Sequence, residues 1–312
     1  MITTKTCLIL GAGASAPFGY PVGGALTERI KTELRPDKPG QLHHELVSAG
    51  FSADLLLGFR DELRYSQRPS IDAFLEDWEA DFMEVGKAAI AASLIRHEDR
   101  DKVVDEPNWY RRLFADMTDE KDFAKNQLGI VTFNYDRSLE YFLLRCLPSR
   151  HHVPQSEAVK WISQMRIIHM YGSLGGLPEL CVGGRTYGES GTAATLAAAK
   201  EIHLVRGVET PASFIEARSL MKEAERIIVL GFGFEKQNLS RLGLMDFAKT
   251  ARISATLYNV FPVDEKRIKA THPERDERAI RYEYDEIEPA IDWFKGHALK
   301  FMENHGIEEA EE

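Results

Sequence analysis

Asn134 and Asp136 stand where an apolar stretch of the chain ends, and such side chains can orient a water molecule or a hydroxyl group. Residues 129–132 read Gly-Ile-Val-Thr, which predicts a buried strand. Alternation along that strand would point Thr132, Asn134 and Asp136 the same way at its carboxyl end. The amide of Asn134 offers both a donor and an acceptor. Thr, Asn and Asp are also ordinary turn formers, so both interpretations stay open at this point.

His169 occupies the same kind of position on a second predicted strand, residues 165–170, just before the turn at Gly172. An imidazole with an ordinary pKa near 6.5 suits proton transfer at neutral pH. A lone histidine is more often structural, but its place at a strand end favours a chemical role.

The first strand is predicted to end in a turn of the kind that binds phosphate. The apolar run 8–10 leads directly into Gly11, Ala12 and Gly13. Gly11 would permit a tight turn, and Gly13 would let backbone N–H groups approach a pyrophosphate. A helix beginning near Gly23 or slightly earlier would place its positive end beside them. The motif alone is weak, because a glycine turn after a strand is often only a turn.

A second glycine turn follows the predicted strand 227–230. It reads Gly-Phe-Gly-Phe from Gly231, and Asn238 follows it. A turn at a strand end suits contacts to a ribose or an adenine, and its alternative is a tight turn before a helix. The segment 27–36 is helical in period and stops at a proline, where a dehydrogenase would need a second strand ending in an acidic residue. Hydride transfer is therefore disfavoured.

Periodicity predicts an α/β fold with a Rossmann-like, mostly parallel sheet flanked by helices, in one domain over residues 1–312. A helical insertion is expected over about 42–125 and a glycine-rich loop over about 175–191. Phe18 and Tyr20 lie among turn formers, which predicts a mobile lid over the nucleotide site or an ordinary surface loop with a core aromatic.

The carboxyl-terminal part of the chain is predicted to hold one more strand and one more helix. The strand covers residues 253–260 and ends at Asn259, and the helix covers about 287–304. An acidic tail, residues 307–312, is expected to be solvated.

Composition excludes several classes of protein. The 312 residues are 44% hydrophobic and 28% charged, which is typical of a globular protein. A net charge of −10 and a pI near 5.6 disfavour nucleic-acid binding by this chain alone. No apolar run approaches the roughly 18 residues of a membrane helix, so a cytoplasmic location is expected. The three cysteines, Cys7, Cys146 and Cys181, are too few for a four-cysteine zinc ribbon.

Four strand-end segments resemble the sirtuin-like family in identity and order: residues 11–15, 132–136, 168–172 and 230–233. In that family the first motif binds the phosphates of NAD, the Asn-x-Asp pair lies by the nicotinamide ribose, and the histidine before glycine is the catalytic base. The residues expected to act in catalysis are Asn134, Asp136 and His169. With Thr132 and the second glycine turn included, the residues expected to contact NAD are Gly11, Ala12, Gly13, Ser15, Thr132, Gly231, Phe232 and Asn238.

Two departures separate the chain from sirtuin deacylases. Those enzymes carry Asp-Phe-Arg after Ile-Pro in the first loop, where this chain has the sequence Tyr-Pro-Val-Gly-Gly at residues 20–24, and they usually carry the zinc ribbon. The chain looks instead like bacterial sirtuin-like NAD hydrolases of antiphage defence. That resemblance implies NAD as a substrate, no zinc, and activity that is regulated. It also implies assembly as a homo-oligomer or with a partner such as a HerA-like ATPase.

The expected reaction is cleavage of the nicotinamide–ribose bond of NAD to nicotinamide and ADP-ribose. This cleavage builds positive charge on the ribose, so it needs a positioned water and shielding from solvent. Asn134 would orient the water, neutral His169 would accept a proton, and Asp136 would anchor the carboxamide or orient its neighbours. No second carboxylate is visible for a paired glycosidase arrangement. An NAD-dependent protein deacylase and a non-catalytic NAD or ADP-ribose sensor remain as alternatives.

Overall fold

The computed structural model describes most of the chain. The described residues are 1–78, 80–117, 123–204, 211–234, 236–247, 250–257, 291–295, 298 and 302. Asn259 and the acidic tail at 307–312, for which the sequence makes predictions, lie outside them.

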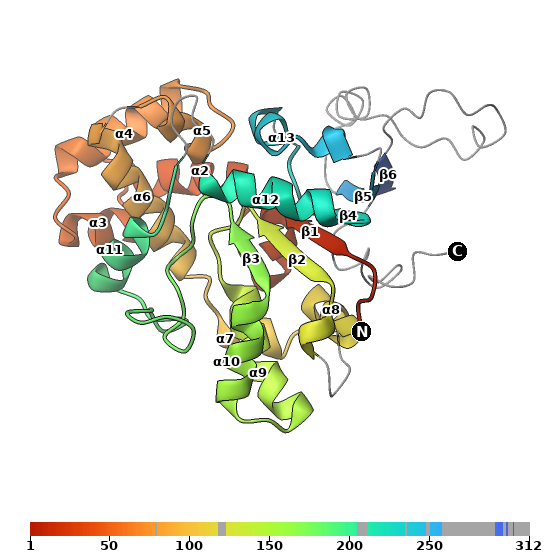
Figure 1. Cartoon of the computed structure of the whole chain (residues 1–312). Coiled ribbons are helices and arrows are strands. Elements are labelled where there is room, and N and C mark those ends of the chain that lie inside the picture. Colours follow the sequence, from red (N-terminus) through yellow and green to blue (C-terminus); the bar gives the residue numbers. More distant parts are fainter. Residues whose placement is uncertain are drawn as a thin grey trace, which may run out of the picture.

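Six parallel strands form one sheet at the centre of the molecule (Figure 1). Their order across the sheet is β3-β2-β1-β4-β5-β6, and every neighbouring pair is parallel. This is the strand order of a doubly wound dinucleotide-binding fold, so the predicted Rossmann-like class is confirmed. The strands are β1 (Thr6–Leu10), β2 (Leu128–Thr132), β3 (Arg166–His169), β4 (Arg226–Leu230), β5 (Arg252–Leu257) and β6 (Ile291–Lys295).

The strand register brings four predicted strand ends into one row. Thr132 on β2 pairs with Leu10 on β1 and with His169 on β3, while Leu10 also pairs with Leu230 on β4. The chain leaves β1 toward β2 on one side of the sheet and β4 lies on the other side, so the strand order reverses beside β1. Ligands of open parallel sheets bind at such a reversal, at the carboxyl ends of the strands.

Helices cover the sheet because its central strands are buried on both faces. All residues of β1, β2 and β4 are buried, as expected for parallel strands with near-continuous apolar sequences. On one face lies α12 (Ala212–Glu223), which crosses the strands in Figure 1. It packs so closely on β2 that a Cβ atom added at Gly129 would lie 2.3 Å from Leu220 Cδ1.

The predicted helical insertion is helical in the structure and lies between β1 and β2. Within it, Ser70 caps the helix Ile71–Glu76 by accepting a hydrogen bond from the N–H of Ala73. The helices before β2 are α1 (Ala12–Ser15), α2 (Gly23–Glu33), α3 (Gln41–Ser48), α4 (Ala53–Tyr65), α5 (Ile71–Glu76), α6 (Ala80–Ile95), α7 (Arg100–Val104) and α8 (Trp109–Met117), with short 3₁₀ turns at Ala16–Phe18 and Phe123–Lys125.

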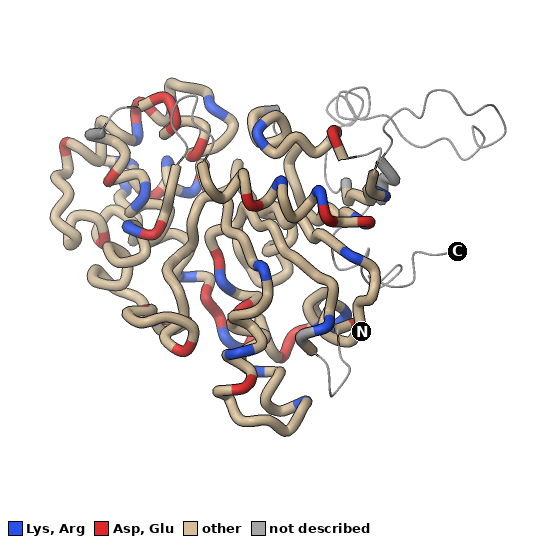
Figure 2. Tube along the Cα trace, viewed as in Figure 1, with Lys and Arg blue, Asp and Glu red and all other residues tan. Residues whose placement is uncertain are grey.

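The second half of the chain alternates helices with strands and contains the predicted glycine-rich loop. Residues 175–191 form neither helix nor strand. Lys and Arg are interspersed with Asp and Glu along the described elements (Figure 2). The remaining helices are α9 (Ser138–His151), α10 (Gln155–Gln164), α11 (Thr192–Lys200) and α13 (Lys236–Leu242), with a 3₁₀ turn at Leu244–Phe247.

The helix predicted to begin near Gly23 is confirmed as α2, and a short helix that the sequence did not predict, α1, precedes it directly after Gly11. One prediction of secondary structure is wrong in part. The expected terminal helix begins too early, since Ile291–Lys295 is strand β6 and pairs with β5. Its sequence, Ile-Asp-Trp-Phe-Lys, is rich in residues that favour strands, whereas Ala298 and Met302 are helical.

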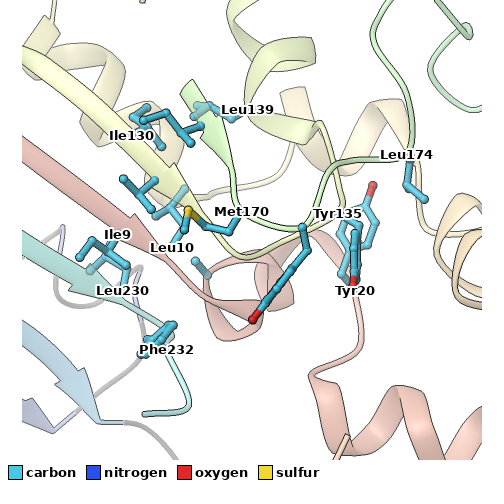
Figure 3. Close-up of a cluster of buried hydrophobic side chains, with 14 of the residues drawn as sticks. Ile9, Leu10, Tyr20, Ile130, Tyr135, Leu139, Met170, Leu174, Leu230 and Phe232 are labelled. Atoms are coloured by element: carbon cyan, nitrogen blue, oxygen red, sulfur yellow. The ribbon is translucent and has the colours of Figure 1, made fainter. Parts of the chain in front are cut away.

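Phe18 and Tyr20 are core residues, which contradicts a mobile lid at these side chains. Phe18 stacks on Tyr110 with ring centroids 4.2 Å apart, and the hydroxyl of Tyr20 lies 3.1 Å from that of Tyr187. The buried side chains around the strand ends, shown in Figure 3, include Ile9, Leu10, Tyr20, Ile130, Tyr135, Leu139, Met170, Leu174, Leu230 and Phe232.

Candidate active site

A chain of hydrogen bonds joins the first loop to the end of β2. The Asn134 amide Nδ2 donates to the Gly11 carbonyl at 2.9 Å and to Ser15 Oγ at 2.8 Å. Ser15 Oγ in turn donates to Asp136 Oδ2 at 2.5 Å. Because a carbonyl oxygen only accepts, the Gly11 contact fixes which end of the Asn134 amide is the NH₂ group. The amide oxygen of Asn134 is therefore the group that it can offer to a ligand.

His169 is held at both ring nitrogens. Nδ1 lies 3.0 Å from the main-chain oxygen of Asn134, and Nε2 lies 2.8 Å from Glu140 Oε1. The side chains of His169 and Glu140 are 16% and 15% exposed, so water reaches the pair only in part. Both neighbours are acceptors, so the geometry fits an imidazolium that donates two hydrogen bonds.

The electrostatics of the pair agree with this geometry. Burial disfavours a charged imidazole, but the charge and hydrogen bond of Glu140 outweigh it, and the pKa of His169 lies above its ordinary 6.5. Burial likewise disfavours the Glu140 carboxylate, but His169 outweighs it and lowers the pKa of Glu140 below 4.5. Each partner thus stabilises the charged form of the other.

Asp136 is buried and has both carboxylate oxygens engaged. Oδ2 accepts from Ser15, and Oδ1 accepts from the N–H and the hydroxyl of Ser138 at the start of α9. Burial raises the pKa of Asp136 above its ordinary 3.8, against the opposing effect of these hydrogen bonds. This arrangement leaves little capacity for Asp136 to bind a carboxamide, and it suits the orientation of Ser15 and Asn134.

One small cavity lies among these groups. Its volume is about 10 Å³, close to the space that one water molecule needs and far below the volume of a dinucleotide. Ser15, Thr132, Asn134, Asp136 and His169 of the expected site therefore meet at one place. The lining residues are Leu10, Ser15, Tyr110, Ile130, Thr132, Asn134, Asp136, Leu139, Glu140, Ile167 and His169.

The two glycine turns pack against each other. The N–H groups of Gly11 and Gly13 donate to the carbonyls of Leu230 and Gly231, both at 2.9 Å. A Cβ atom at Gly231, whose φ is +61°, would lie 2.1 Å from the nitrogen of Ala14. These two N–H groups are therefore occupied within the chain, and the glycines are required by the close approach of the two loops.

The other expected contact residues lie outside the cavity lining. Phe232 is buried, with its ring centroid 4.8 Å from that of Phe133. Asn238 on α13 accepts a hydrogen bond from the hydroxyl of Tyr171. Gly11, Ala12, Gly13 and Gly231 form the paired turns beside the cavity.

Helix α5 is hydrogen-bonded to segments that follow β2 and β4. The hydroxyl of Tyr135 donates to Asp72, and Glu76 accepts from Arg241 at 2.7 Å and from Gln237 at 2.5 Å. The insertion is thereby attached both to the loop after β2 and to α13, which follows β4.

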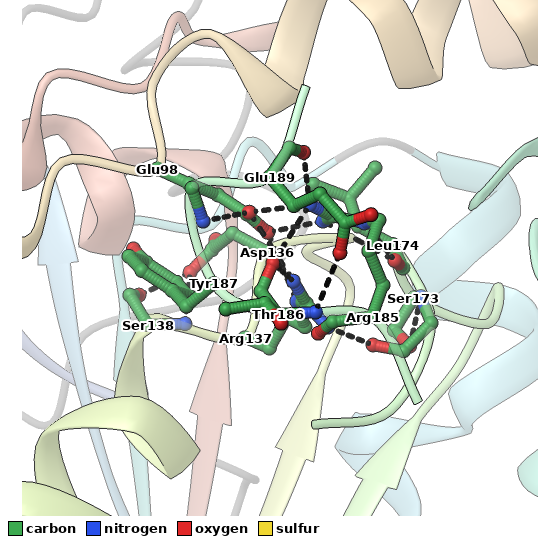
Figure 4. Close-up of polar contacts among 12 residues, drawn as sticks. Glu98, Asp136, Arg137, Ser138, Ser173, Leu174, Arg185, Thr186, Tyr187 and Glu189 are labelled. Carbon is green, nitrogen blue, oxygen red and sulfur yellow. Dashed lines mark hydrogen bonds and ion pairs between the residues drawn. The ribbon is translucent and has the colours of Figure 1, made fainter. Parts of the chain in front are cut away.

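A buried ionic cluster anchors the residue after Asp136. Arg137 Nε lies 2.9 Å from Glu98 Oε1, and Arg185 NH2 lies 2.6 Å from the same oxygen. Figure 4 shows the three side chains together, with Arg185 coming from the glycine-rich loop and with Asp136 beside them. Arg137 also donates to the carbonyls of Gly175 and Gly176. The cluster therefore fixes the 175–191 loop against the strand-end loop that carries Asn134.

Glu140 is the functional candidate that sequence reasoning missed. The sequence showed no second carboxylate for a paired arrangement with Asp136, and this prediction is wrong. Glu140 and Asp136 both line the cavity. The available signal was spacing, since Asp136 precedes α9 and Glu140 stands four residues further on, which places both on one side of a helix start.

Within the described residues, no group of three or more His, Cys, Asp or Glu side chains could hold a metal ion. The described helices include none that is long and apolar enough to span a membrane.

No protein-family model matches the chain, and no curated protein matches it in sequence. Among solved structures, Sir2Tm bound to a propionylated peptide is similar, with a TM-score of 0.44 and 14% identity over 97% of this chain and 93% of that chain. A second structure, which concerns the structural basis of sirtuin substrate affinity, has a TM-score of 0.42 and 15% identity over 98% of this chain and 94% of that chain. Sir2 in complex with EX-527, 2'-O-acetyl-ADP-ribose and deacetylated p53 peptide has a TM-score of 0.40 and 14% identity over 97% and 94%. These similarities are remote, and the fold assignment rests on strand order and register.

Proposed function

We propose that the chain hydrolyses NAD at the nicotinamide–ribose bond and releases nicotinamide and ADP-ribose. The observation that carries the proposal is the convergence of Asn134, Asp136 and His169 on one water-sized cavity at the carboxyl ends of β2 and β3. Dinucleotides bind parallel sheets of this strand order at that edge. The motif resemblance described above names NAD among them.

The chemistry needs few groups because nicotinamide is a good leaving group. The water oxygen bonds to the ribose carbon, the carbon–nitrogen bond breaks, and its electron pair neutralises the pyridinium nitrogen. Asn134 positions the water through its amide oxygen, while its NH₂ group donates to Ser15, which in turn donates to Asp136. The partly buried cavity limits exchange with bulk water and strengthens electrostatic stabilisation of the developing ribosyl cation.

The dinucleotide lies over the mouth of the cavity in this proposal, because the cavity itself admits only a water-sized guest. Because the N–H groups of Gly11 and Gly13 donate to the carbonyls of Leu230 and Gly231, the phosphates of NAD bind other donors of the first loop unless the paired turns separate. NAD is a substrate here, and no zinc is required.

The biological setting of the proposal comes from the motif resemblance alone. In this setting the protein is a cytoplasmic effector of bacterial antiphage defence that depletes NAD after an infection signal. The effector assembles as a homo-oligomer or with a partner such as a HerA-like ATPase.

The test measures nicotinamide release from NAD by the wild-type chain and by Asn134→Ala and His169→Ala, with His44→Ala on the exposed face of α3 as a matched control. Release by the wild type and the control, with a loss on the order of 100-fold in the two site variants, supports the proposal. Activity that survives both changes contradicts the site.

The same assay separates the alternatives. A deacylase would need an acyl-lysine peptide for nicotinamide release, and a sensor would bind NAD without cleaving it.

A further inference from the structure

We infer that Glu140 and His169 act as one proton-handling unit, in which the Glu140 carboxylate accepts the proton of the attacking water. This inference deepens the proposed NAD hydrolysis and rests on it for the reaction step. It replaces a histidine base with a carboxylate that the imidazole holds in place.

The first step of the argument is the occupancy of the imidazole. Nδ1 faces the Asn134 carbonyl at 3.0 Å, and Nε2 faces Glu140 Oε1 at 2.8 Å. A carbonyl oxygen cannot donate, so Nδ1 carries a proton. A proton also lies between Nε2 and Oε1, whichever of the two atoms holds it. Neither ring nitrogen therefore presents a free lone pair to water.

The second step is the surroundings of the pair. Asp136, from the loop before α9, and Tyr110, from α8, line the same cavity. Arg137 adds to the larger effect of His169 in favouring an ionised Glu140. Tyr110 is buried and its pKa is raised by that burial, so it stays neutral. Both oxygens of Asp136 already accept hydrogen bonds, from Ser15 and Ser138. Glu140, with one oxygen on His169, is left as the carboxylate that can face a water molecule.

The third step is the balance of the reaction. An O–H bond of water breaks and its proton goes to Glu140, while the oxygen forms its bond to the ribose carbon. The carbon–nitrogen electron pair remains on nicotinamide. Glu140 later loses the proton to solvent, so the pair returns to its initial state. Throughout, the Nδ1–H of His169 holds the backbone at Asn134, which links the proton acceptor to the residue that positions the water.

An experiment without NAD tests the pair itself. The pKa of His169 is followed by NMR of the imidazole in the full wild-type chain and in Glu140→Gln. Glu62→Gln, a change at an exposed residue of α4, is the control. We expect the pKa to fall in Glu140→Gln and to stay unchanged in the control, because the neutral amide no longer stabilises the imidazolium. An unchanged pKa in Glu140→Gln overturns the inference.

A second experiment tests the reaction step. Nicotinamide release is measured from pH 5 to 9 for the wild type, Glu140→Gln and His169→Gln. We expect a loss on the order of 100-fold in Glu140→Gln, a smaller loss in His169→Gln, and a wild-type rate that does not rise through the pKa of His169. A wild-type rate that rises with pH through that pKa, or a Glu140→Gln variant of full activity, overturns the inference while the proposed hydrolysis stands. If the wild type releases no nicotinamide but the NMR shift is found, the proposed function fails and the Glu140–His169 pair stands.

Discussion

Ser15 and Asp136 are 121 positions apart in the sequence, and their side chains are joined by a hydrogen bond of 2.5 Å. The bond connects the turn after β1 to the turn after β2, and Asn134 donates to the same Ser15 hydroxyl. The orientation of the Asn134 amide therefore depends on a residue of the first loop.

Removing the Ser15 hydroxyl should weaken catalysis and stability together. Ser15→Ala leaves a buried carboxylate and an amide without one partner each, which costs about 1–3 kcal/mol of unfolding free energy. We expect nicotinamide release to fall by roughly tenfold, because Asn134 loses one of its two contacts. Chemical denaturation and initial rates measure both effects. Ser163→Ala, on the exposed face of α10, is the control, and equal behaviour of the two variants would contradict the role of Ser15.

The close packing of the two glycine turns predicts a sharp contrast between neighbouring glycines. Gly231→Ala places a Cβ atom 2.1 Å from the Ala14 nitrogen in a left-handed backbone conformation, whereas Gly233→Ala meets nothing within 4 Å. Gly231→Ala should cost at least about 2 kcal/mol of unfolding free energy. Gly233→Ala should change it by less than about 1 kcal/mol. Similar midpoints for the two variants in urea denaturation would rule out the observed packing.

Because the Glu98 cluster is buried, neutralising Glu98 is predicted to lower the free energy of unfolding strongly. Glu98→Gln leaves Arg137 and Arg185 buried without a counter-ion, and removing one partner of such a cluster costs about 3–5 kcal/mol. The change in unfolding free energy is measured by denaturation, with exposed Glu62→Gln as control. A cost below about 1 kcal/mol would show that the cluster does not anchor the loop.

The Glu140–His169 pair predicts a pH window for its contribution to stability. The folded pKa of His169 lies above 6.5, so its contribution is full below pH 6.5 and is lost as the pH rises through the raised pKa. The folded pKa of Glu140 lies below 4.5, so its contribution is present above pH 4.5 and is lost as the pH falls through the lowered pKa. The difference in unfolding free energy between the wild type and Glu140→Gln should be largest between pH 4.5 and 6.5. A difference that grows steadily toward pH 9 would refute the ion pair.

Much of the fold could be predicted because parallel strands are short apolar runs that stop at turn formers. Residues 8–10, 129–132 and 227–230 have this pattern, and all lie in central strands. Strand β6 could not be recognised, because its five residues mix apolar and charged side chains beside helical sequence. The sequence also could not show that Gly11 and Gly13 donate to Leu230 and Gly231, since those contacts depend on how distant turns pack.

The grouping of Asn134, Asp136 and His169 followed from their positions at strand ends, which the register brings side by side. Glu140 could not be found in this way, because it lies on a helix and meets His169 only through tertiary packing between residues 29 apart. The sequence left a buried aromatic in the first loop only as an alternative to a mobile lid, for a similar reason. Tyr187, the partner of Tyr20, comes from the glycine-rich loop.

The most direct measurement of the central claim compares nicotinamide and ADP-ribose production from NAD by the wild type and by Asn134→Asp. The substituted carboxylate keeps the shape of asparagine but cannot donate to the Gly11 carbonyl or to Ser15. The account predicts equimolar products from the wild type and a rate lower by on the order of 100-fold in the variant. Undiminished product formation by Asn134→Asp, or none by the wild type, would contradict it.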